Sequence, residues 1–91
     1  MTDRDQKELQ KALRQHLKDP LSAQVEQAKV FVTPKGQRMI CGQYNAKNAF
    51  GGYIGFQTFS IPYSPQYDTV PIMSSGMVAD IDCNGAGYNL K

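Results

Sequence analysis

The sequence contains a single histidine, two cysteines and only a small excess of positive charge. Ten Lys and Arg residues against eight Asp and Glu residues leave a net charge of +2. This balance excludes an acidic mimic of nucleic acid and a strongly basic packaging protein, but it allows a local basic patch. No apolar run approaches the roughly 20 residues of a membrane-spanning helix, and the chain does not open with a signal peptide. Its 91 residues predict a single domain.

The two cysteines are too isolated to form a metal site. No second cysteine and no histidine lies near Cys41 or Cys83 at the spacing of zinc ligands, so we expect neither a metal nor another cofactor. Two alternatives remain: one disulfide, or two free thiols packed as small apolar side chains. A disulfide would close a loop of about 43 residues, contribute roughly 4 kcal/mol, and indicate an oxidising compartment.

The first segment has the pattern of an amphipathic helix from about Asp3 to Lys18. Pro20 ends it, because the residue before a proline is disfavoured in helical geometry. At 100° per residue, one side collects the positions suited to a core, namely Leu9, Ala12, Leu13, His16 and Leu17. The opposite side collects a basic face formed by Arg4, Lys7, Lys11, Arg14 and Lys18.

The rest of the chain has the composition of short strands joined by turns. The expected strands are Gln24–Thr33, Arg38–Ala46, Tyr53–Ile61 and Met77–Cys83. Residues 34–37 predict a hairpin turn, and residues 84–91 a C-terminal loop. The predicted fold is α+β: an N-terminal amphipathic helix packed on a three- to four-stranded antiparallel sheet.

Three short elements resemble a known group of proteins. They are Asp-Pro-Leu-Ser-Ala at 19–23, Cys-Gly-Gln-Tyr-Asn-Ala-Lys-Asn at 41–48 and Gly-Gly-Tyr-Ile-Gly-Phe at 51–56. Together they resemble small, uncharacterised bacterial and prophage proteins, many of them secreted or lipid-anchored in the envelope. The resemblance covers under half of the chain and carries no chemistry to transfer. It implies the periplasm or envelope if a leader was removed, and the cytoplasm otherwise.

The second and third elements admit two interpretations. Asparagine and glycine allow tight backbone geometry, so the segment could serve only to form a hairpin and pack its aromatic rings. Within the strand, Gly55 would then mark a close approach by a ring or a neighbouring backbone. The alternative is a recognition surface for a partner, because exposed aromatic and amide side chains suit protein contact. Its candidate residues are Tyr44, Asn45, Lys47, Asn48, Phe50, Tyr53, Tyr63 and Tyr67.

The sequence argues against an active site. His16 stands alone on the apolar side of the helix, where a core-edge role is more common than catalysis. Asp80 and Asp82 would lie on the solvated face of a strand, without a partner acid or base. Cys41 and His16 could pair as nucleophile and base, but nothing in the sequence except the types of these two residues supports that pairing.

These observations favour a non-enzymatic binding module of inhibitor or accessory type that acts on a protein partner in the bacterial envelope or in a phage context. The alternative is a cytoplasmic, phage-encoded inhibitor of a host nucleoprotein complex, similar to an anti-CRISPR protein, whose basic face contacts nucleic acid. A small hydrolase is the third hypothesis.

Overall fold

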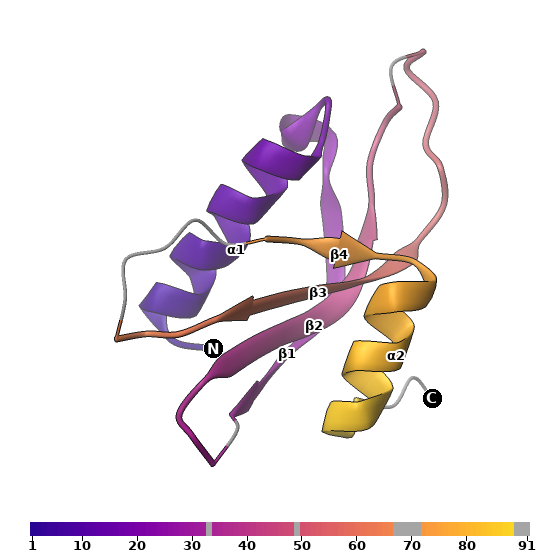
Figure 1. Ribbon diagram of the computed structural model, residues 1–91. Helices are drawn as coiled ribbons and strands as arrows, with labels where there is room; N and C mark the ends of the chain where they lie inside the picture. Colours follow the sequence, from indigo (N-terminus) through magenta and orange to yellow (C-terminus); the bar gives the residue numbers. More distant parts are fainter. Residues whose placement is uncertain (33, 49, 67–71, 89–91) are drawn as a thin grey trace.

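The computed structural model describes residues 1–32, 34–48, 50–66 and 72–88. The order of elements is α1 (Asp3–His16), η1 (Pro20–Ser22), β1 (Gln24–Val32), β2 (Arg38–Asn45), β3 (Gln57–Tyr63), β4 (Ser74–Ser75) and α2 (Met77–Ala86). The predicted α+β class, with an N-terminal helix on an antiparallel sheet, is confirmed (Figure 1). Within the described residues, neither helix has the length and apolar character needed to cross a bilayer.

Helix α1 begins where the sequence predicts and ends two residues earlier. Thr2 and Asp5 form a capping box: the Thr2 hydroxyl accepts from the Asp5 backbone N–H, and the Asp5 carboxylate accepts from the Thr2 backbone N–H at 2.8 Å. Leu17 closes the helix in extended geometry. Lys18 therefore does not continue the helical row of basic residues, as the sequence pattern had predicted.

The sheet has the order β1-β2-β3-β4 and is antiparallel throughout. The predicted turn at 34–37 joins β1 to β2, and Gly36 adopts the positive φ of 83° that such turns require. β1 has a register shift between Glu26 and Lys29. Strand β3 begins at Gln57 rather than at Tyr53, because Tyr53 makes only an isolated bridge with Lys47.

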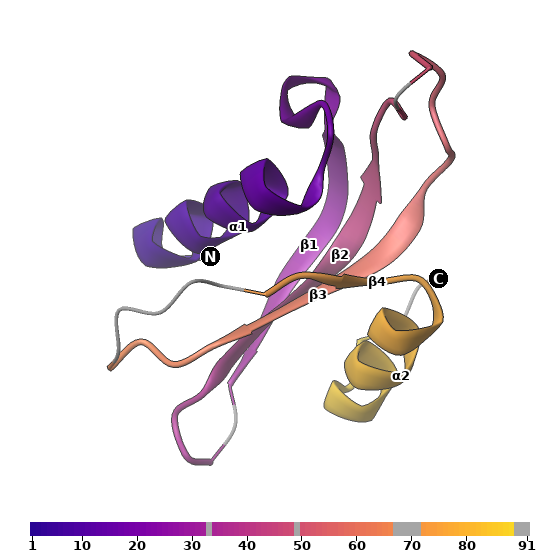
Figure 2. The ribbon, with the colours of Figure 1, turned by 45° about the horizontal axis from the view of Figure 1, so that its top comes forward.

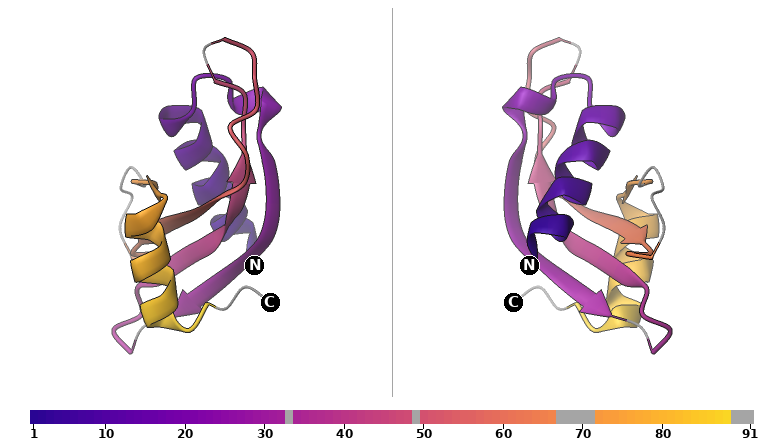
Figure 3. Two further views of the ribbon diagram at one scale, coloured as in Figure 1. Left: turned by 90° about the vertical axis from the view of Figure 1, so that its right-hand side faces the viewer. Right: turned by 90° about the vertical axis from the view of Figure 1, so that its left-hand side faces the viewer.

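The two helices lie on opposite faces of the sheet (Figures 2 and 3). Alternation along the strands explains this arrangement, because successive side chains point to opposite faces. Ile40 of β2 and Phe59 of β3 pack in one core cluster with Leu9 and other residues of α1. Cys41, the neighbour of Ile40, belongs instead to a smaller cluster on the face of α2.

The expectation of a final strand over Met77–Cys83 is wrong, because these residues form the first part of helix α2. The buried residues of this helix are Ala79 and Cys83, which are four positions apart and so share one helical face. Asp80 and Asp82 are exposed on the helix rather than on a strand. The short strand β4 precedes this helix, and the first residues of the expected C-terminal loop, from residue 84, belong to the helix.

A disulfide between Cys41 and Cys83 joins α2 to the middle of β2. Of the two sequence alternatives, the structure therefore shows the disulfide rather than two free thiols. Among the described residues, the hydrophobic side chains packed around it are the buried Tyr88 and the partly buried Phe31 and Met39. The Tyr88 hydroxyl also donates to the backbone carbonyl of Gln27 in β1 (3.0 Å), and burial raises the pKa of this hydroxyl.

Candidate interaction surface

The connection between β2 and β3 projects beyond the sheet beside η1 (Figures 1 and 3). We call residues 46–48 and 50–56 of this connection the tip hairpin. Two contacts attach it to η1: the Lys47 backbone N–H donates to the Ser22 hydroxyl oxygen (3.0 Å), and the Tyr53 hydroxyl donates to the Ser22 carbonyl (3.4 Å). The first and third elements of the sequence resemblance, far apart in the chain, thus meet at one end of the molecule.

The polar groups of the tip hairpin hold its own backbone. The Asn48 side-chain oxygen accepts from the backbone N–H groups of Phe50 (2.9 Å) and Gly52 (3.2 Å), and the Asn48 N–H donates to the Gly52 carbonyl (2.8 Å). The Asn45 side-chain oxygen accepts from the Gly55 N–H (2.9 Å). These oxygens are engaged within the chain, as the hairpin interpretation of the motif predicts.

Glycine is needed in the hairpin for its backbone geometry rather than for space. Gly51 and Gly55 have φ values of 83° and 91°, which residues with a side chain rarely adopt. A Cβ added at Gly55 would meet no atom within 4 Å, so the expected close approach of a ring or a backbone at this position is wrong.

The apolar side chains of this end of the molecule are exposed to solvent. Leu21 of η1 is 98% exposed and Phe50 is 95% exposed, while Tyr53, Ile54 and Phe56 are about half exposed. We call these five residues the apolar tip. The Lys47 ammonium lies 5.7 Å from the centre of the Tyr53 ring and adds a positive charge beside it. Such a concentration of apolar groups is typical of an interaction site.

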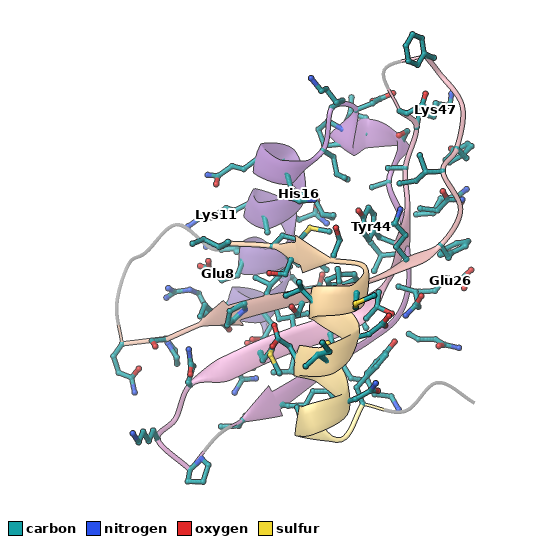
Figure 4. All side chains as sticks on the ribbon, turned by 45° about the vertical axis from the view of Figure 1, so that its right-hand side comes forward. Glu8, Lys11, His16, Glu26, Tyr44 and Lys47 are labelled. Atoms are coloured by element: carbon teal, nitrogen blue, oxygen red, sulfur yellow. A yellow bond between two sulfur atoms is a disulfide. The ribbon has the colours of Figure 1, made fainter. Side chains whose placement is uncertain are left out.

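Two of the predicted partner-binding residues lie in the core instead. Tyr44 and Tyr63 are each 3% exposed, so the expectation that their rings belong to an exposed recognition surface is wrong. Both share the face of the sheet that packs against α1, and Figure 4 shows Tyr44 within the body of the protein and Lys47 on the projecting hairpin. Tyr67 lies outside the described residues, whereas Lys47, Asn48, Phe50 and Tyr53 are exposed on the tip hairpin.

The basic face of α1 is reduced to three of its five predicted members. The Arg4 side chain donates to Glu8 (2.8 Å), and its guanidinium lies 5.7 Å from the centre of the Tyr63 ring. Lys18 lies beyond the helix end. The remaining cations line a groove of about 310 Å³ together with two glutamines; the lining residues are Gln6, Lys7, Gln10, Lys11 and Arg14.

A buried ion pair anchors the start of α1 to the sheet. Arg38 of β2 donates two hydrogen bonds to the Asp5 carboxylate, at 2.9 and 2.7 Å, and the Tyr63 hydroxyl donates a third. The guanidinium of Arg38 holds the pKa of Asp5 well below its usual range. Burial, together with the adjacent Asp5 carboxylate, raises the pKa of Tyr63. The side chains that attach α1 are thus fixed rather than available to a ligand.

The catalytic pairing considered from the sequence does not form. His16 is exposed on α1 rather than at the edge of the core, while Cys41 is fully buried in its disulfide on the side of the sheet that faces α2. Among the described residues no three His, Cys, Asp or Glu side chains gather as metal ligands would.

The sequence pattern missed three members of the apolar tip: Leu21, Ile54 and Phe56. Ile54 and Phe56 were assigned to a strand, where alternation would bury one face. Leu21 follows Pro20 in a turn. This turn lies outside every segment with an apolar period, and that position could have indicated that the Leu21 side chain is exposed.

Comparisons of the chain with protein-family models, with curated proteins and with solved structures found no match.

Proposed function

We propose that the protein is a non-enzymatic binding module that docks on a protein partner through the apolar tip. The observation that carries this proposal is the exposure of Phe50 on a hairpin whose backbone is held by its own hydrogen bonds, with the exposed Leu21 of η1 at the same end of the molecule. A fixed loop loses little conformational entropy on association, so the rings are presented in a preorganised form.

The chemistry of the surface favours a protein partner. Aromatic side chains with an apolar body are enriched at the centres of protein interfaces, and the Tyr53 hydroxyl and the Lys47 ammonium supply a polar edge. Burying an exposed Phe side chain contributes about 1.5–3 kcal/mol. Phe50 is therefore expected to dominate the affinity, as central aromatic residues do in other interfaces.

The disulfide supports a place for this module in an oxidising compartment such as the bacterial envelope, because cytosolic thiols are generally kept reduced. The activity in this proposal is inhibition or assistance of the partner by steric contact, and it requires no reacting group on the module.

Site-specific photo-crosslinking in the bacterial envelope tests the proposal. A benzophenone amino acid placed at position 50 is expected to form a crosslink to one defined protein. The same probe at position 81 on α2, where Ile81 is also strongly exposed, is the matched control and should not capture that protein. Phe50→Ala should then weaken binding of the purified partner by at least tenfold. Equal capture from both positions, or capture from neither, would contradict docking through the tip.

A further inference from the structure

A second surface, separate from the apolar tip, is rich in positive charge. The groove on the outer side of α1 is lined by three cations and two side-chain amides. We propose that this groove binds the phosphate backbone of duplex nucleic acid without reading its sequence.

The charges facing this groove are only partly neutralised by the protein. Lys7 and Arg14 form no ion pair within the described part of the chain. Lys11 has one long contact, 3.7 Å from its ammonium nitrogen to Glu8. Glu8 makes a shorter contact with Arg4 through the same carboxylate oxygen, at 2.8 Å, so the contact of Lys11 is the weaker of the two. Lys11, whose side chain is half exposed, can therefore turn toward a ligand.

The spacing of the cations matches a phosphate backbone. Arg14 follows Lys7 by seven positions, which corresponds to a rise of about 10.5 Å along the helix axis. One strand of a duplex rises about 3.4 Å per phosphate and also winds around its axis, so neighbouring phosphates lie further apart than this rise and a row of this length spans roughly two or three of them. The three cations can therefore face up to three phosphates, with the amides of Gln6 and Gln10 placed to donate further hydrogen bonds.

The composition of the groove argues against two other anionic partners. Its described lining contains no aromatic side chain, and single strands are bound largely by stacking of bases on such rings. Its described lining also contains no apolar residue of the kind that occupies the centre of protein interfaces, which disfavours an acidic protein. Duplex phosphates need neither of these features.

The salt dependence of binding to a labelled duplex of about 20 base pairs tests the proposal. Fluorescence anisotropy between 25 and 200 mM salt should give a slope of about −2.7 in log K against log salt for three contacts. Lys7→Gln and Arg14→Gln should each weaken binding and make the slope shallower by about 0.9, for any duplex sequence. Glutamine has nearly the helix propensity of lysine and arginine, so the fold should persist.

Two matched variants distinguish binding at the groove from a general effect of the protein's net charge. Lys35→Gln removes one positive charge from the exposed turn before β2 and should leave the slope unchanged. Asp3→Asn removes an exposed carboxylate one turn before Lys7 and should strengthen binding. A loss with Lys35→Gln as large as with Lys7→Gln would overturn the proposal. Tighter binding of an acidic polypeptide, such as polyglutamate, than of the duplex at the same salt concentration would also overturn it.

Discussion

The disulfide should account for a large share of the stability of this protein, and replacing both cysteines by alanine tests that expectation. Cys41 and Cys83 are separated by 42 positions in the sequence. The chain-entropy model assigns such a loop about 4 kcal/mol, whereas a chain of this length has a total stability of about 5–14 kcal/mol. We therefore expect Cys41→Ala/Cys83→Ala to lower the free energy of unfolding by about 4 kcal/mol and the melting temperature by roughly 15–30 °C.

The loss should be most evident in α2, because within the described part of the chain few side chains of this helix are buried against the sheet. Its buried residues are Ala79 and Cys83, while Met77, Val78 and Ile81 are exposed. Without the disulfide, amide hydrogens of residues 77–86 should exchange faster than those of β2.

Urea denaturation gives the global stability, and hydrogen exchange monitored by mass spectrometry gives the local effect. Wild-type protein in excess reductant is the control: it should match the double variant, on which the reductant should have no effect. A loss below about 1 kcal/mol, outside the usual range for such a bond, would refute the reasoning. So would unchanged protection of α2.

Other predictions concern the start of α1 and the packing of β2. Arg38→Ala leaves the Asp5 carboxylate buried without its cation and should cost about 3 kcal/mol in a urea titration at pH 7. Because the pKa of Asp5 is lowered in the folded protein, its stabilisation is complete above the unfolded value of about 4 and decreases as the pH falls below it. Asp5→Asn should remove this part of the acid sensitivity, and an unchanged pH profile would contradict the assignment. Gly42→Ala should cost about 1–3 kcal/mol, since its Cβ would lie 2.7 Å from the Phe59 ring. Gly85→Ala, in an uncrowded position of α2, should instead stabilise the protein by about 0.5–1 kcal/mol in the same urea titration.

The first half of the fold could be predicted from sequence because each of its signals is local. The apolar period of α1, Pro20 after it and the turn at 34–37 each act over a few residues, and the structure contains the corresponding elements. The strand predicted over Met77–Cys83 was wrong because the apolar residues of this segment fit both the period of a strand and that of a helix. Ala79 and Cys83 share one face in either element. A contact of Cys83 with Cys41, made across 42 positions, could therefore not decide between the two elements from the sequence.

The candidate site was predicted in part for a related reason. Aromatic composition located the tip hairpin but could not separate its exposed rings from the buried rings of Tyr44 and Tyr63 in the adjoining strands, because that distinction depends on register. The predicted strand stopped at Ile61, before Pro62, and so left Tyr63 outside the sheet, whereas β3 continues to Tyr63. In the structure, β4 flanks β3 only at Phe59 and Ser60, so among the described residues Pro62 lies at an edge of the sheet, where proline is tolerated.

The charge of α1 shows why a count of charged residues in the sequence underestimates the positive charge on the surface of the helix. The helix carries three carboxylates and four Lys or Arg residues, which suggests a nearly neutral element. Folding buries two of those carboxylates, because Asp5 turns to Arg38 and Glu8 lies beneath Arg4. Asp5 therefore holds the helix to the sheet, Glu8 pairs within the helix, and most of the positive charges stay outside. Of the three carboxylates only Asp3 is exposed, so α1 presents a cationic surface that its own composition largely conceals.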